Sequence, residues 1–421
     1  MKRMLACFLT LSLCICLLGC ASASGEETIT VALWGDDARK AAFQELFAPL
    51  EAEKNIKMDV QVYPASEYAT KILTQIAGGS APDVVWLTER YYPLFASQGV
   101  LADLNPLMSD AAYKFEDYSA SLVGNYLVGG NLMAVPFTAN PVALFYNASL
   151  FQEAGLETPL ELYQKGEWTF DRMLECAKAI TALGNGTYGV SFLQTGDPTN
   201  WPVLLNYFWT QGVDFFNADT TRCTVNTPEG VAALQKYYDM MFVDNVHVKP
   251  SDTVAFESGK LGMYQDNPSA SANYQDVGFD WDYICFPANG EGELNNVVGV
   301  ALYGVINTTK NYEAALDVVK YITGEELQTA LQKTFTPTRE SLKASEAFLG
   351  VSEKMPTPKA RGILYGDVFA ATTKTYPATT NWAEINLKVK EILDKLYTGN
   401  YSVADVAAEL EREVNALLAL Q

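Results

Sequence analysis

Strand-like and helix-like patterns alternate along most of this chain. Ile29, Val31 and Leu33 alternate with polar or small neighbours, as in a half-buried strand, and apolar residues at helical spacing follow over 43–50. A second such pair covers 58–62 and 69–76, with Ser66 as the expected helix cap. The run 84–87 is continuously apolar, which is typical of a strand covered on both faces. This order predicts an α/β fold.

The second half of the chain repeats the pattern. Thr169 is the predicted cap of a helix, a strand is expected over 297–306, and a helix over 315–322. The chain ends in two predicted helices, over 385–396 and from Ser402 onward. A chain of 421 residues is too long for one small core, so two lobes are expected. No long linker is present, so short crossings should join them.

The N-terminus predicts the compartment. Lys2 and Arg3 precede an apolar stretch over 4–18, which is too short for a membrane-spanning helix and is typical of a signal peptide over 1–19. The tetrapeptide that ends at Cys20 reads Leu-Leu-Gly-Cys and resembles the lipobox of bacterial lipoproteins. That resemblance implies lipidation of Cys20, a flexible tether over 20–27, and a protein anchored outside the cytoplasm on the cell membrane.

Composition excludes several kinds of site. Of the 7 cysteines, only Cys176, Cys223 and Cys285 lie beyond the predicted leader and the lipidated Cys20, and these are too few and too scattered for a disulfide framework or a zinc site. They are expected to be small buried residues. The net charge of −21 opposes binding to nucleic acid. We therefore expect no metal, no cofactor and no nucleic-acid partner.

Several sequence blocks resemble one family across nearly the whole mature chain. Residues 77–86 read AGGSAPDVVW and 98–104 read QGVLADL; VPF stands at 135–137, ALFYN at 143–147, LFQEAGL at 150–156 and AFESGKLGM at 255–263. In this order they resemble the bacterial extracellular solute-binding proteins of the maltose type. The resemblance implies two hinged α/β lobes that close on a ligand. It also implies a monomer without enzymatic activity that delivers a carbohydrate to the permease subunits of an ABC transporter.

Mapping these blocks onto the chain predicts discontinuous lobes. Lobe one would comprise 28–139 and 285–335, and lobe two 140–284 and 336–421. The crossings would fall near 138–140, 283–285 and 334–336, where a few residues at element ends could act as hinges.

Sugar recognition needs flat aromatic faces together with carboxylate, amide or guanidinium groups, and in an open α/β lobe these groups follow the carboxyl ends of strands. Trp34 and Asp36 follow the first predicted strand, and Glu89 and Arg90 follow the strand over 84–87. The resemblance adds an acid–arginine pair in the latter loop. The remaining candidates come from lobe two and the crossings: Asn140, Asp197, Trp201, Asp266, Trp281, Arg339 and Trp382. Trp34 and Trp382 should lie on opposite lobes and approach each other as the cleft closes. Trp86 and Trp168 are expected in the core.

The sequence also allows other functions. A hydrolase with a catalytic histidine would depend on His247 alone, and nothing near it resembles a nucleophile elbow. A glycosidase needs only two carboxylates, which 50 acidic residues would supply in any fold. Within the binding class, the ligand could instead be a polyamine or a phosphate ester, and the protein could serve a sensor rather than a transporter.

Overall fold

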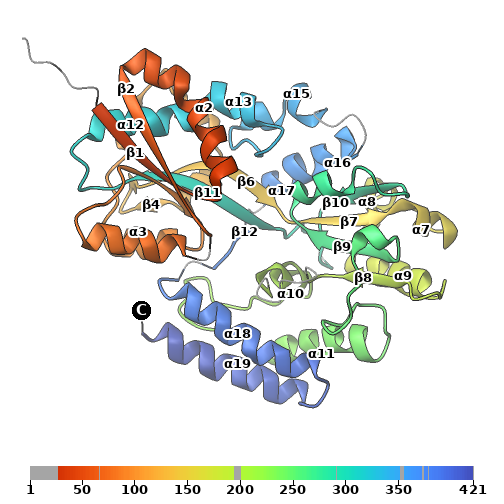
Figure 1. Ribbon diagram of the computed structural model, residues 1–421. Helices are drawn as coiled ribbons and strands as arrows, with labels where there is room; N and C mark the ends of the chain where they lie inside the picture. Colours follow the sequence, from red (N-terminus) through yellow and green to blue (C-terminus); the bar gives the residue numbers. More distant parts are fainter. Residues whose placement is uncertain are drawn as a thin grey trace, which may run out of the picture.

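The computed structural model describes residues 27–420 except 66, 194–200, 291, 351–354, 372–373 and 378. It has the two-lobed α/β architecture that the sequence predicts, with one central sheet in each lobe (Figure 1). The predicted signal peptide, Cys20, the Ser66 cap and Asp197 lie outside the described residues.

The sheet of lobe one is built around parallel strands from the N-terminal part of the chain. Strand β1 pairs in parallel with β2 and β3, while β11 pairs antiparallel with β3 and β6 and in parallel with β12. The bounds are β1 (Glu27–Trp34), β2 (Ile56–Tyr63), β3 (Val84–Thr88), β6 (Val135–Pro141), β11 (Val297–Val305) and β12 (Lys374–Thr375). The order β12-β11-β3-β1-β2 brings the carboxyl ends of β1 and β3 to one edge. Helices α2 (Asp37–Lys54), α3 (Tyr68–Ala77) and α12 (Tyr312–Ile322) cover this sheet.

The sheet of lobe two has four strands in the order β10-β7-β9-β8. Their bounds are β7 (Ala143–Asn147), β8 (Tyr188–Ser191), β9 (Leu261–Asp266) and β10 (Trp281–Ile284). Helix α9 (Phe170–Thr181) packs on β8, and its N-terminus is capped by the side chain of Thr169, as predicted. The C-terminal helices α18 (Trp382–Tyr397) and α19 (Val403–Leu418) form a hairpin against α11 (Pro228–Phe242), at the bottom of Figure 1.

Shorter helices complete the two lobes. They are α4 (Tyr92–Ser97), α5 (Asn105–Ser109), α6 (Ala120–Gly124), α7 (Ala148–Glu153), α8 (Pro159–Gln164), α10 (Leu205–Thr210), α13 (Glu325–Leu331), α14 (Glu340–Lys343), α15 (Glu346–Leu349), α16 (Pro358–Gly362) and α17 (Val368–Ala370). A small hairpin joins β4 (Leu127–Val128) to β5 (Asn131–Leu132). Within the described residues, no helix is both long and apolar enough to cross a membrane.

The strand pairing places the crossings differently from the sequence prediction. Strand β6 remains paired with β11 up to Pro141, so the first passage falls at Val142, and the second lies between Ile284 and Val297. Strand β12, which the prediction gave to lobe two, pairs with β11 of the lobe-one sheet. The sequence could not reveal this, because a strand of two residues has no readable periodicity.

The predicted core residues are buried. Trp86 and Trp168 expose 2% and 3% of their surface, and the three body cysteines are fully buried and free. Burial raises the pKa of the Cys176 thiol to about 11 and that of Cys223 to about 12, so both are neutral, inert packing groups.

Candidate functional site

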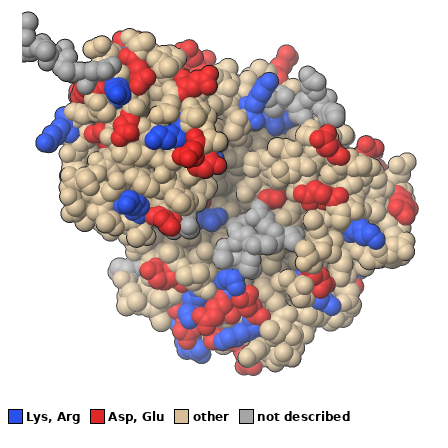
Figure 2. All heavy atoms as spheres, viewed as in Figure 1, with Lys and Arg blue, Asp and Glu red and all other residues tan. Residues whose placement is uncertain are grey.

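The carboxyl ends of β1 and β3 carry the strongest site candidates of lobe one. Trp34 ends β1 and is half-buried, with its ring edge-on to Trp86 at a centroid distance of 6.2 Å. Its indole N–H is shielded from solvent and has no hydrogen-bond partner among the described residues. Figure 2 shows the molecule hollowed between this lobe and the rest of the chain.

Arg39 positions Trp34 although no sequence pattern singled it out. Its guanidinium lies 5.5 Å from the ring centroids of both Trp34 and Trp86, and its Nη1 donates to the carbonyl of Trp34 at 2.9 Å. Gly35, with φ of +151°, permits this fold-back, because a Cβ there would lie 2.7 Å from the Cδ of Arg39. A cation over the indole face holds the ring in place.

Asp36 acts as the cap of helix α2. Its Oδ1 accepts the backbone N–H of Arg39 at 3.0 Å, while the residue as a whole stays exposed. Asp36 therefore stabilises the start of α2, and it also lies near the carboxyl end of β1, as predicted. Within the described residues the cap uses only one carboxylate oxygen, which leaves the other available to a ligand.

Glu89, Arg90 and Asn140 are brought together around the first residues of β11. Glu89 is 8% exposed; its Oε2 accepts the N–H of Val300 at 2.8 Å and its Oε1 lies 3.3 Å from Nε of Arg90. Asn140 pairs with Gly299 in the sheet and accepts a hydrogen bond from the hydroxyl of Thr336. Burial raises the pKa of Glu89, and the charge of Arg90 and the backbone N–H oppose that rise.

Tyr376 belongs to this cluster and was not predicted. The guanidinium of Arg90 lies 4.1 Å from its ring centroid, and the ring passes 3.6 Å from where a Cβ on Gly299 would stand. Tyr376 follows β12 directly, and only the pairing of β12 with β11 brings it beside Arg90. No motif around position 376 could have indicated this contact.

Two of the three candidate tryptophans of lobe two, Trp201 and Trp382, pack on each other in its interior. Trp201 and Trp382 are 1% and 4% exposed and stack on each other at 6.1 Å between ring centroids and 30° between planes. Trp201 also packs on Phe215 at 5.0 Å. Trp382 was expected to form an open cleft wall, and the structure corrects this: its face is covered by another indole.

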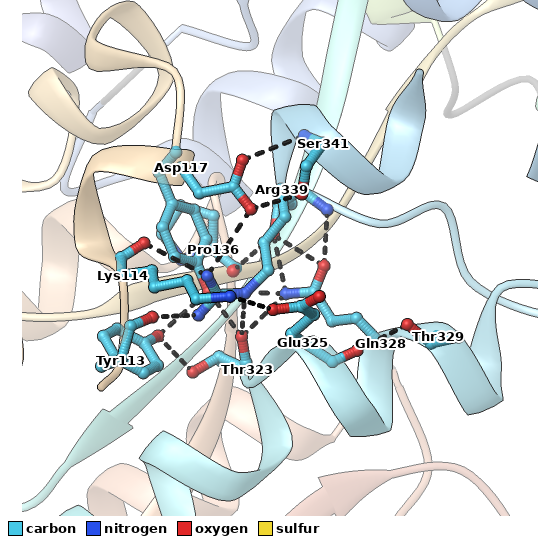
Figure 3. Close-up of polar contacts among 12 residues, drawn as sticks. Tyr113, Lys114, Asp117, Pro136, Thr323, Glu325, Gln328, Thr329, Arg339 and Ser341 are labelled. Atoms are coloured by element: carbon cyan, nitrogen blue, oxygen red, sulfur yellow. Dashed lines mark hydrogen bonds and ion pairs between the residues drawn. The ribbon is translucent and has the colours of Figure 1, made fainter. Parts of the chain in front are cut away.

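Trp281 and Arg339, two further candidates, are also buried. Trp281 is 3% exposed in β10, where its Nε1 donates to the carbonyl of Tyr274 at 2.7 Å, so it belongs to the lobe-two core. Arg339 is 1% exposed and donates to the carbonyls of Tyr113, Lys114 and Thr323 (Figure 3). Because the guanidinium is used internally, Arg339 leaves the candidate site.

Asp266 ends β9 and faces the first crossing. It pairs in register with Ala143, the first residue of β7, and its Oδ1 accepts the N–H of Asn267 at 2.6 Å. It is partly exposed, so it stays in the candidate site.

The only histidine is structural. His247 is fully buried; its Nε2 accepts the N–H of Phe192 at 2.9 Å and its Nδ1 lies 2.6 Å from the carbonyl of Val248. With both ring nitrogens engaged, it cannot act as a base on a substrate. The described residues also contain no group of three acidic, histidine or cysteine side chains that could hold a metal.

Comparisons with known proteins agree with this architecture. A cyclic α-maltosyl-1,6-maltose binding protein from Arthrobacter globiformis superposes with a TM-score of 0.79 at 24% identity, covering 94% of this chain and 100% of that one. An ABC substrate-binding protein from Listeria monocytogenes, solved with cycloalternan, gives a TM-score of 0.79 at 22% identity over the same shares of the two chains.

Sequence relatives extend over similar lengths. The diacetylchitobiose binding protein DasA of Streptomyces coelicolor is 23% identical over 413 residues, which are 94% of this chain and 91% of that protein. The galactooligosaccharide-binding protein of Bacillus subtilis is 21% identical over 85% of this chain and 82% of that protein. The family model described as "Bacterial extracellular solute-binding protein" matches residues 34–329. This chain belongs to the family of bacterial extracellular solute-binding proteins.

Proposed function

We propose that this protein binds a sugar or oligosaccharide between its lobes and delivers it to an ABC transporter, without chemical change to the ligand. The observation that carries the proposal is the grouping at one edge of the lobe-one sheet, where Trp34 and the Glu89–Arg90 pair end neighbouring strands. An indole face and planar polar groups at strand ends suit the apolar and hydroxyl surfaces of a pyranose. The names of similar proteins, which include binding proteins for diacetylchitobiose, galactooligosaccharide and cyclic α-maltosyl-1,6-maltose, support this ligand class.

A thermal-shift screen followed by calorimetry tests the proposal. A specific ligand should raise the melting temperature by mass action. The screen should include neutral oligosaccharides, polyamines and phosphate esters, because the last two represent the competing ligand classes. Only the oligosaccharides are expected to stabilise the protein, and they should be recovered unchanged. Stabilisation by spermidine or a phosphate ester alone, or turnover of a glycan that follows the protein through purification, would contradict the proposal.

The contribution of Trp34 can be measured with one variant and one control. Trp34→Ala should weaken binding of the sugar found in the screen by about 1–3 kcal/mol, the range for a buried aromatic contact. Tyr401→Ala is the matched control, since Tyr401 is an aromatic residue with 50% exposure between α18 and α19. Equal affinities of the Trp34→Ala variant and the unmodified protein would remove Trp34 from the site.

The membrane anchor is a separate part of the proposal. We propose that Cys20 carries the lipid and that the protein sits outside the cytoplasm on the cell membrane, where two or more acyl chains give stable attachment. Cys20→Ser should abolish metabolic labelling with palmitate and release the protein from the membrane fraction. Labelling that persists in this variant would disprove the assignment.

A further inference from the structure

A second candidate site is a cavity that shares no lining residue with the strand ends that carry Trp34 and Glu89. It has a volume of about 560 Å³. Its lining comes from the start of α9, the end of α10 with the residues up to Asp214, Lys236 of α11, Lys374 of β12, and residues 288–290, 293 and 295 of the second passage. None of the lobe-one candidates Trp34, Asp36, Glu89 or Arg90 lines it. Its size is that of a small-molecule site.

The cavity wall contains polar groups without partners. Asn295 is only 6% exposed, yet neither side of its amide makes a hydrogen bond within the described chain. Trp209, 8% exposed, also has no hydrogen-bond partner there for its indole N–H. Neither polar group is among the solvent-shielded unpartnered atoms of the described residues, so both can be reached from the cavity. An amide and an indole N–H left open toward a cavity are therefore suited to a ligand that donates and accepts hydrogen bonds.

Four of the five charged side chains in the wall form ion pairs. Lys236 lies 3.2 Å from the Oδ1 of Asp171 and Lys374 lies 3.6 Å from the Oδ1 of Asp214. The fifth, Glu293, accepts a hydrogen bond from the amide of Asn289 at 3.0 Å and keeps its negative charge. The wall thus offers no unpaired cation for a phosphate and only one unpaired carboxylate, whereas a polyamine would need several. This balance favours a neutral ligand.

Aromatic rings complete the lining. The ammonium of Lys374 lies 4.7 Å from the ring centroid of Trp209, and that of Lys236 lies 4.5 Å from Phe170. These contacts hold both ammonium groups at the wall, where each keeps N–H donors for a hydroxyl oxygen. Lys374 also connects the cavity to lobe one, because β12 pairs with β11.

We propose that this cavity is a second binding site, separate from the strand-end site, for a neutral hydroxyl-rich molecule of mono- to disaccharide size. Asn295, the indole N–H of Trp209 and the ammonium of Lys374 would contact the ligand directly. The inference rests on the proposed function only for the choice of sugars and polyols as probes.

Fluorine NMR of the full-length protein labelled with 5-fluorotryptophan tests the inference. The chain has 7 tryptophans, and Trp209→Phe and Trp34→Phe identify two of the resonances by their loss. Maltose and D-mannitol are the neutral probes, and inorganic phosphate and spermidine are the charged ones. Maltose or mannitol should shift the Trp209 resonance saturably, and phosphate and spermidine should not.

Two wall variants and one strand-end variant separate this site from the other. Asn295→Leu keeps the side-chain shape but removes the amide, and it should weaken the Trp209 response about tenfold or more, as expected for lost hydrogen bonds. Lys374→Met should also weaken the Trp209 response. It replaces Asn295→Leu if that variant does not fold, and the other tryptophan resonances would report the loss of folding. Trp34→Ala should leave the Trp209 midpoint unchanged.

The outcomes distinguish this inference from the proposed function. A Trp209 resonance that moves with neither neutral probe, or moves with phosphate or spermidine instead, would overturn the second site. So would a Trp209 midpoint that weakens in Trp34→Ala, because the resonance would then report lobe closure. If Trp34 stays silent while Trp209 responds, the strand-end proposal fails and the second site stands.

Discussion

His247 shows at the scale of one residue how burial sets the protonation state. Burial lowers its pKa to about 4, and the N–H of Phe192 occupies the nitrogen that would take up a proton. Between pH 6.5 and pH 4 the unfolded chain binds a proton that the folded chain does not. Stability should therefore fall as the pH falls through this window, by about 1.4 kcal/mol per pH unit at most.

The contribution of His247 to the pH dependence of stability can be isolated by comparison with His247→Gln, because no other histidine exists in the chain. Urea unfolding at pH 7 and pH 4.5 should show a larger loss for the unmodified protein than for the variant. Asp282, whose pKa burial raises to about 6, acts in the opposite direction but is common to both proteins. Parallel pH profiles would refute the assignment.

Trp382 gives a second prediction at this scale. Because it is buried against Trp201, Trp382→Ala should lower the free energy of unfolding of the ligand-free protein by about 3–5 kcal/mol. Trp34→Ala should cost clearly less, since Trp34 is half-buried. Denaturant unfolding of both variants decides the matter. If Trp382→Ala lowers the free energy of unfolding only slightly, Trp382 belongs to the cleft wall and not to the core.

At the scale of elements, buried contacts of Arg339 attach the segment that follows α13 to lobe one. Its guanidinium lies 4.8 Å from the ring centroids of both Tyr113 and Tyr118. It donates to the backbone carbonyls of Tyr113, Lys114 and Thr323, as Figure 3 shows. Thr338 adds a hydrogen bond to the carbonyl of Pro136 at 2.9 Å. The segment up to Arg339 therefore belongs to lobe one, three residues beyond the predicted crossing.

Arg339→Lys should be strongly destabilising although it conserves the charge. A lysine cannot reproduce the planar fork that reaches three carbonyls, so buried acceptors would lose their donors, at a cost of about 3 kcal/mol. Arg222→Lys is the matched control, because Arg222 is 65% exposed in a surface pair with Glu411 and should change stability by about 0.5 kcal/mol or less. Equal losses in the two variants would refute the role of Arg339.

At the scale of the whole molecule, the passages between the lobes allow a hinge motion. The first passage is Val142, which lies between strands β6 and β7. Beside it, the hydroxyl of Thr336 donates a hydrogen bond to Asn140 and so links this passage to the segment after α13. A ligand that contacts both lobes binds the closed form better and shifts the population toward it. The radius of gyration from small-angle X-ray scattering should therefore fall when the ligand is added. An unchanged radius under conditions where calorimetry shows saturation would contradict closure.

The local elements of this protein could be predicted from its sequence. Alternation around Val31, helical spacing within α2, and the caps at Thr169 and Ser402 all gave elements that the structure contains, because these signals depend on neighbours within a few residues. The ordered family blocks identified the family and the two-lobed fold. Of the candidate site, the position of Trp34, Asp36, Glu89 and Arg90 at one edge of the sheet could be predicted, since residues after neighbouring parallel strands meet there.

Other features of this protein are determined only by its tertiary structure. Whether an indole lies in a cleft or in a core depends on what covers it, and Trp201 covers Trp382 from a distant part of the chain. Arg339 became structural only because Tyr113, Lys114 and Thr323 turn their carbonyls toward it. Strand β12 exists because β11 offers it free hydrogen-bonding groups, and it carries Tyr376 to Arg90 and Lys374 to the second cavity. Burial and long-range pairing are properties of the folded chain, and no local pattern encodes them by itself.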